Sequence, residues 1–215
     1  MSAPSPLLSL LRRHPVIPVV TVEDAEMAPR LAEALLAGGI GIVEVTLRSA
    51  AGLATIRRLK QGHASLVVAA GTVLSVQQLE SAAQAGADFA VSPGTTAALL
   101  AAAQTMAYPY LPGLATAGEA MVAAEAKFDV LKFFPAQAAG GVAMLKAWAE
   151  PLPHLSFCPT GGVSAANLAD YLALGNVVCA GGSWIATRQA LKDGDWAGIS
   201  ARAAAALATA HGSPA

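Results

Sequence analysis

Short apolar runs recur along the chain, and the segments between them have the periodicity and capping residues of helices. Eight runs rich in apolar and β-branched residues lie at 16–22, 42–47, 66–72, 89–92, 110–114, 130–134, 155–160 and 177–180. Helix starts are indicated by the capping-box spacing of Ser75 with Gln78 and of Thr116 with Glu119. Alternating strands and helices predict a parallel α/β sheet, and eight units favour closure into a (β/α)8 TIM barrel. An open, doubly wound sheet is the alternative, but no Gly-x-Gly-x-x-Gly fingerprint follows the first run.

We expect the whole chain, residues 1–215, to form this single barrel domain, because no linker interrupts the pattern. Residues 7–13 are predicted to form a short N-terminal helix under the barrel, and residues 195–210 a closing helix. A composition of 55% hydrophobic and 13% charged residues supplies the apolar core that such a fold needs.

Charge and hydropathy argue against several classes of partner. The formal net charge is −1 and no basic run exceeds two residues, so no nucleic-acid interface is expected. The uncharged stretch between Asp88 and Glu119 is broken by prolines and glycines, and no membrane span is therefore predicted. The first residues lack the basic start of a secretion signal, so a cytoplasmic protein is expected. Cys158 and Cys179 lie in apolar runs and are predicted to be buried free thiols.

The four histidines are badly placed for a metal site. In a (β/α)8 barrel the loops that follow the strands build the active site. His14, His63 and His154 each precede a predicted strand, and His211 lies in the tail. Metal-dependent enzymes of this fold need a cluster of ligands at the strand ends. We therefore expect neither a metal site nor a cofactor.

Two charged side chains lie inside apolar runs, at Glu44 and Lys132. Glu44, Thr46 and Arg48 share parity in a strand and are expected to point to one side. Apolar neighbours desolvate Lys132, which favours the neutral amine that can attack a carbonyl. One interpretation is a nucleophilic lysine with Glu44 as acid or base; the other is a buried ion pair that only fills the barrel. Thr72 could donate a hydrogen bond to a substrate carboxylate or cap the following turn.

Glycine-rich loops follow the seventh and eighth runs. Gly161 and Gly162 precede a helix predicted to begin at Ser164, and Gly182 and Ser183 follow the eighth run. Loops after strands seven and eight form the usual phosphate site of this fold, because glycine lets backbone N–H groups approach the oxygens closely. Either loop alone could be an ordinary turn, but the two together predict a phosphate-binding site.

Six motifs in order resemble the 2-keto-3-deoxy-6-phosphogluconate aldolases, a family shared with 4-hydroxy-2-oxoglutarate aldolase. The resemblance covers roughly residues 7–210. The motifs are EVTLR at 44–48, GTV at 71–73, SPG at 92–94, LKFFPA at 131–136, CPTGG at 158–162 and GGSW at 181–184. The segment after Pro135 departs from the pattern, because Gln137 stands where an acid is expected in many relatives.

The resemblance implies a cytoplasmic, homotrimeric class I aldolase with a phosphorylated 2-keto acid as its substrate. Cleavage of 2-keto-3-deoxy-6-phosphogluconate would give pyruvate and glyceraldehyde 3-phosphate, with Lys132 as the Schiff-base lysine and Glu44 as the general acid and base. The galactonate epimer of this substrate is a close alternative. A sugar-phosphate epimerase or isomerase, or a non-catalytic phosphosugar-binding barrel, is a more distant one.

The same resemblance implies a set of binding residues around the lysine. They are Arg48 and Thr72 for the pyruvate carboxylate, Pro93 and Phe134 for the pocket wall, Thr160 for a sugar hydroxyl, and Gly161, Gly162 and Ser183 for the phosphate.

Overall fold

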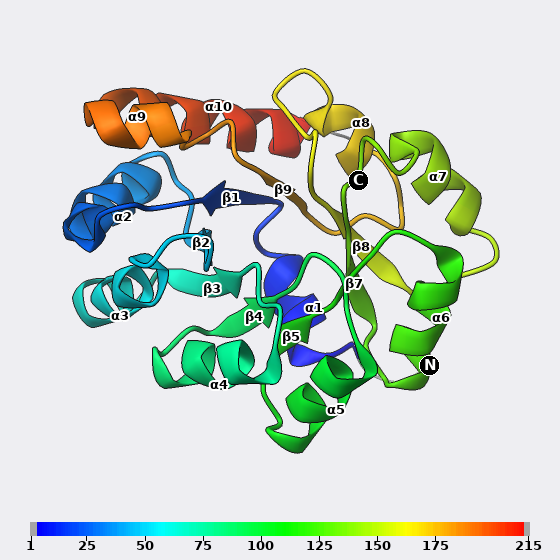
Figure 1. The fold of residues 1–215 in the computed structure, drawn as a ribbon. Helices are drawn as coiled ribbons and strands as arrows, with labels where there is room; N and C mark the ends of the chain where they lie inside the picture. Colours follow the sequence, from blue (N-terminus) through cyan, green and yellow to red (C-terminus); the bar gives the residue numbers. More distant parts are fainter. Residues whose placement is uncertain (1–3, 213–215) are drawn as a thin grey trace.

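The computed structural model describes residues 4–212 and has its strands inside and its helices outside (Figure 1). The strands are β1 Val16–Val20, β2 Ile42–Thr46, β3 Val67–Gly71, β4 Phe89–Val91, β5 Tyr110–Leu111, β6 Gly113–Leu114, β7 Val130–Phe133, β8 Ser156–Pro159 and β9 Ala180–Gly182. All paired strands run parallel, as the alternation of strands and helices predicts.

The helices from α2 to α8 lie between strands, α1 precedes β1, and α9 and α10 follow β9. They are α1 Pro6–Leu11, the 3-10 turn η1 Ala25–Met27, α2 Ala28–Ala37, α3 Gly52–Gly62, α4 Val76–Gln84, α5 Ala97–Thr105, α6 Ala117–Glu125, α7 Gly141–Trp148, α8 Leu168–Leu172, α9 Arg188–Asp193 and α10 Trp196–Gly212. Thr116 and Glu119 form a complete capping box at α6, and the Ser75 hydroxyl accepts a hydrogen bond from Gln78 N at α4. Within residues 4–212, no helix is long and apolar enough to cross a membrane.

The prediction of a closed (β/α)8 TIM barrel is wrong. The strands form a six-stranded half-barrel sheet, in the order β5-β4-β3-β2-β1-β9, and a separate three-stranded sheet, in the order β6-β7-β8. The predicted fifth strand is divided at Pro112, which has no N–H to donate to a ladder, so its two halves belong to different sheets. At the other seam the segments around β8 and β9 are joined by isolated bridges, Phe157 with Val177 and Thr160 with Gly181, instead of a ladder.

The eighth predicted strand was also placed too early. It was expected at 177–180, whereas β9 begins at Ala180 and extends through Gly182. Gly182 therefore lies inside a strand and not in the loop that follows it.

The predicted N-terminal helix is present as α1 and is attached to the start of β7. The Ser5 hydroxyl accepts from Leu8 N and donates to Asp129 Oδ1 at 2.6 Å. Leu7, Leu8 and Leu11 of this helix are buried in the core.

The register between the strands brings distant residues to one face. Glu44 of β2 pairs with Ala69 of β3, while Lys132 of β7 pairs with Gly113 of β6 and Cys158 of β8. Side chains of paired residues in neighbouring strands point to the same side of a sheet. The two strand neighbours of Lys132, Gly113 and Cys158, are small, and this leaves room around the long lysine side chain.

Candidate active site

Lys132 and Glu44 meet across the two sheets in a buried ion pair. Lys132 Nζ lies 3.0 Å from Glu44 Oε1 and 3.3 Å from Oε2. The two residues are only 4% and 3% exposed. The ammonium also lies 5.4 Å from the centre of the Phe134 ring, within the range of a cation–π interaction. The contact fits both a catalytic pair and a structural one, so the surrounding groups must distinguish them.

Gly71 of β3 provides the space that the Glu44 carboxylate occupies. A Cβ atom at position 71 would lie 2.3 Å from Glu44 Oε1 and 2.7 Å from its Cδ. Thr46, two residues after Glu44 on β2, donates to or accepts from the Thr21 hydroxyl at 2.8 Å, and both hydroxyls are buried. The sequence analysis assigned no role to Gly71 or Thr21.

The two cysteines are free, buried thiols, which confirms that prediction, and Cys158 is the β8 partner of Lys132. A hydrogen bond from Cys179 lowers the pKa of the Cys158 thiol against the opposing effect of burial, and the nearby charge of Lys132 lowers it further. The pKa of Cys179 is raised well above its usual value by the same hydrogen bond and by burial. The Cys158 sulfur lies 3.9 Å from the Thr160 hydroxyl, which is buried next to the glycine loop.

Arg48 and Thr72 follow neighbouring strands, β2 and β3. Arg48 lies in the turn after β2, is exposed, and forms no ion pair within the described part of the chain. The strand parity that was used to orient it ends at Thr46. Thr72 has a φ of 59°, a left-handed conformation that is unusual for a β-branched residue and is found most often at functional sites. It does not cap α4, because Ser75 does.

A hydroxyl network fixes the wall that contains Pro93. Ser92 Oγ lies 2.6 Å from Tyr110 Oη and accepts a hydrogen bond from Gly113 N at 3.1 Å. Thr95 Oγ1 lies 2.9 Å from the same phenol oxygen. A Cβ atom on Gly113 would lie 2.4 Å from the Pro93 carbonyl carbon, so the Pro93 backbone packs directly against the strand beside the lysine. No pattern in the sequence predicts this network.

The first glycine loop follows β8. Gly161 and Gly162 have φ values of 92° and 83°, which glycine adopts without strain. The Gly161 carbonyl accepts a hydrogen bond from Gln137 N at 2.9 Å. The Phe134 ring packs on this loop, because a Cβ atom on Gly161 would lie 3.1 Å from it. The helix predicted to begin at Ser164 is α8, which begins later, at Leu168.

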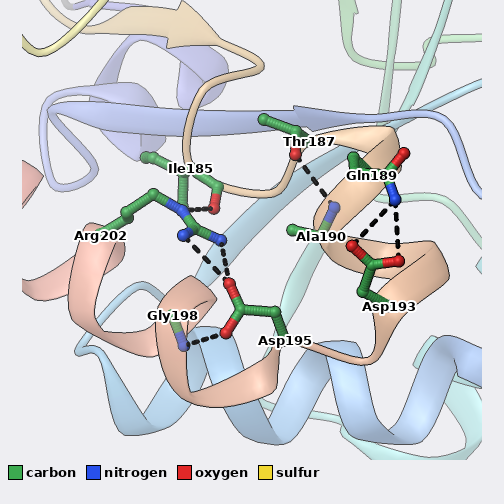
Figure 2. Close-up of polar contacts among 8 residues, drawn as sticks. All are labelled: Ile185, Thr187, Gln189, Ala190, Asp193, Asp195, Gly198 and Arg202. Atoms are coloured by element: carbon green, nitrogen blue, oxygen red, sulfur yellow. Dashed lines mark hydrogen bonds and ion pairs between the residues drawn. The ribbon is translucent and has the colours of Figure 1, made fainter.

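The second loop starts at the exposed Ser183, directly after β9. A Cβ atom on Gly182 would overlap the Trp184 ring, so this glycine makes room for the indole. Further along the loop, the Ile185 carbonyl accepts a hydrogen bond from Arg202 Nε at 2.8 Å. Figure 2 shows how Arg202 also pairs with Asp195 at 3.2 Å. The bridge between Thr160 and Gly181 brings the two loops to adjacent strand ends.

No group of three or more histidine, cysteine, aspartate or glutamate side chains in residues 4–212 is arranged to hold a metal ion. His14, His63 and His154 lie ahead of β1, β3 and β8 respectively, as the sequence predicts.

Comparison with known proteins gives a consistent family match. The family described as KDPG and KHG aldolase matches residues 7–202. The KHG/KDPG aldolase of Escherichia coli K12 is 46% identical over 188 residues, which are 87% of this chain and 88% of that protein. The 2-dehydro-3-deoxy-phosphogluconate aldolase of Pseudomonas aeruginosa is also 46% identical, over 89% of this chain and 87% of its own length.

Solved structures agree with these relatives. A KDPG aldolase from Legionella pneumophila, crystallised with pyruvate captured as a covalent carbinolamine intermediate, has a TM-score of 0.92 and 41% sequence identity. The match covers 94% of this chain and 98% of that one.

Proposed function

Because the chain belongs to the KDPG and KHG aldolase family, we propose that Lys132 forms a Schiff base with the keto carbon of its substrate. The chain is a class I aldolase, an aldehyde-lyase that cleaves 2-keto-3-deoxy-6-phosphogluconate to pyruvate and glyceraldehyde 3-phosphate. The observation that carries the lysine assignment is the buried 3.0 Å contact between Lys132 Nζ and the Glu44 carboxylate, and the family match favours a catalytic pair over a structural one.

Glu44 has two roles in this proposal, and both are proton transfers. Lys132 must lose a proton before it can attack a carbonyl, and the Glu44 carboxylate lies close enough to accept it. Attack on C2 then gives a carbinolamine, whose hydroxyl takes the proton back from the Glu44 carboxylic acid and leaves as water, so that an iminium ion and the Glu44 carboxylate remain.

The iminium ion serves as the electron sink for carbon–carbon cleavage. As the C3–C4 bond breaks, its electrons enter the C2–C3 enamine, and Glu44, acting through a water molecule, takes the proton of the C4 hydroxyl. The aldehyde product leaves, the same carboxylic acid returns a proton to C3, and hydrolysis of the iminium releases pyruvate and the free lysine.

The remaining site residues are proposed to position the two ends of the substrate. Arg48 is an exposed cation without an ion-pair partner in residues 4–212, and with Thr72 it would hold the pyruvate carboxylate. Pro93 and Phe134 would form the pocket wall, and Thr160, which is buried beside the glycine loop, would contact a sugar hydroxyl.

The phosphate is proposed to bind between the two loops. Gly161 and Gly162 have no side chains, so the phosphate could approach the backbone N–H groups of their loop. The exposed Ser183, which starts the neighbouring loop, would add a hydroxyl donor. Gly182 would contribute indirectly, since its lack of a side chain makes room for Trp184 behind Ser183. Anchoring both ends of the substrate holds the C3–C4 bond in line for cleavage.

We further propose cytoplasmic location, a homotrimer and a second activity on 4-hydroxy-2-oxoglutarate. The last is supported by the double name of the Escherichia coli relative. Association is supported by large apolar side chains at the surface, such as Leu74, Met121 and Val122, which are 60%, 56% and 52% exposed. Light scattering on the purified protein would measure the oligomeric state, and a monomer would contradict this proposal.

Borohydride trapping tests the central assignment. Incubation with pyruvate and borohydride should add one reduced pyruvyl group per chain, and peptide mapping should locate it on Lys132. Lys132→Ala should lose both the adduct and aldol cleavage, and Lys132→Arg should be inactive although it keeps the positive charge. Lys146→Ala is the matched control, because Lys146 is exposed on α7. An adduct on another lysine, or activity without any adduct, would refute the proposal.

A further inference from the structure

The side chain of Asn167 joins the two ends of the first glycine loop. Its Nδ2 donates a hydrogen bond to the Gly162 carbonyl at 3.0 Å, and its Oδ1 accepts one from Ser164 N at 2.8 Å. A carbonyl can only accept and a backbone N–H can only donate, so these partners fix which end of the amide is which. The asparagine amide supplies both the donor and the acceptor that these two partners need.

Other donors hold the same loop from the side of β7. Gln137 N donates to the Gly161 carbonyl, and a Cβ atom on Gly162 would lie 2.4 Å from the Gln137 Cβ atom. The Gln137 side chain is itself held, since Tyr171 Oη donates to its Oε1 at 3.1 Å. Both glycine carbonyls are therefore engaged by protein donors.

The direction of the carbonyls matters for an anion. A carbonyl oxygen that faced a phosphate would repel it, whereas the N–H groups of a turn attract it. The loop cannot rely on a helix end for this orientation, because α8 has five residues and begins only at Leu168, directly after Asn167.

We propose that Asn167 is a positioning residue for the substrate phosphate. By holding the Gly162 carbonyl and the Ser164 N–H together, it keeps the carbonyl turned away from the phosphate and the glycine turn open to it. The proposal rests on the proposed function, and in particular on the phosphate lying between the Gly161–Gly162 loop and Ser183.

The test compares two substrates that differ only in the phosphate, 2-keto-3-deoxy-6-phosphogluconate and 2-keto-3-deoxygluconate. Asn167→Ala removes both hydrogen bonds, whereas Asn167→Asp keeps the acceptor, loses the donor and adds a negative charge, so Asn167→Ala is the variant that decides. Each variant should raise KM for the phosphorylated substrate by about tenfold or more, the change expected if the displaced glycine turn loses one N–H hydrogen bond to the charged phosphate. For the unphosphorylated substrate kcat/KM should change by less than about twofold, because neither variant alters Lys132 or the steps that take place there.

Asn176→Ala is the matched control. The Asn176 amide also donates to a backbone carbonyl, that of Leu145, at 2.8 Å, but it lies near the start of β8 and far from the loop ends. This variant should lose some thermal stability and show no difference between the two substrates.

Three outcomes separate the proposals. A selective rise in KM in both Asn167 variants supports the positioning role. If the wild type discriminates strongly between the substrates and the Asn167 variants discriminate equally well, or lose both activities in parallel, the positioning role is refuted and the phosphate site stands. If the wild type itself does not discriminate, the proposed phosphate site fails and the role of Asn167 fails with it, while trapping at Lys132 still reports on the Schiff base.

Discussion

Replacing Gly71 with alanine should inactivate the enzyme without unfolding it. The new methyl group would lie 2.3 Å from Glu44 Oε1, and ordinary contact begins at about 3.4 Å, so the carboxylate must move by ~1 Å. Glu44 is 3% exposed and has little space into which to move. Since a misplacement of ~1 Å can cost about 10²-fold in rate, kcat for aldol cleavage should fall by about two orders of magnitude. The assay is release of pyruvate, measured alongside thermal melting.

Two controls isolate the effect of Glu44. Gly118→Ala introduces the same methyl group into α6, where nothing lies within 4 Å, and should leave activity unchanged. In a Glu44→Ala background there is no carboxylate to displace, so adding Gly71→Ala should lower kcat by less than about twofold. Equal losses from Gly71→Ala in both backgrounds would show that it acts through strand damage and would refute the steric argument.

Three further predictions concern phosphate binding, pH and metals. Gly162→Val should raise KM for the phosphorylated substrate far more than for 4-hydroxy-2-oxoglutarate, and equal losses on both would remove the phosphate assignment. Hydrogen bonds from the Ala115 and Thr116 backbone lower the pKa of Glu119 below 4.5, so its carboxylate stabilises the fold above that pH and stops doing so as the pH falls through its folded pKa. Chemical unfolding of Glu119→Gln and the wild type should therefore differ at pH 7 and converge at low pH. Activity should survive dialysis against EDTA, because the iminium ion is the electron sink; loss that a divalent ion restores would contradict the class I mechanism.

The strands were predictable from the sequence because each is a short run that must be buried on both faces. How the sheet closes was not predictable from that pattern. Pro112 lies in the middle of an apolar run, and its missing N–H became decisive only once its neighbours Tyr110–Leu111 and Gly113–Leu114 paired with different sheets. The repeated strand–helix pattern predicts how many strands there are. It does not predict closure of the sheet, which requires backbone donors and acceptors of the two edge strands to meet.

The chemistry at the centre of the site was easier to predict than its surroundings. Glu44 and Lys132 stand out because charges inside apolar runs are costly unless they are paired, and the structure brings the two together. Nothing comparable marks Asn167, since a polar residue in a loop is the usual case. Its two hydrogen bonds depend on where α8 begins, and the sequence analysis placed that start too early, at Ser164.

Three strand glycines show why the groups around Lys132 and Glu44 could not be predicted from side-chain chemistry. Gly71 makes room for the Glu44 carboxylate, Gly113 lets the backbone of Pro93 approach the strand beside Lys132, and Gly181 would collide with the Thr160 hydroxyl if it had a Cβ atom. Glycine weakens a strand by about 0.5–1 kcal/mol relative to alanine, so intrinsic strand propensity alone would favour alanine at each position. Because the space that each glycine leaves is filled by part of a residue proposed to act on or contact the substrate, an alanine there would collide with that residue, and its displacement would outweigh the gain in strand propensity. The function of these positions lies in a missing side chain, which becomes visible only when the neighbouring strand is in place.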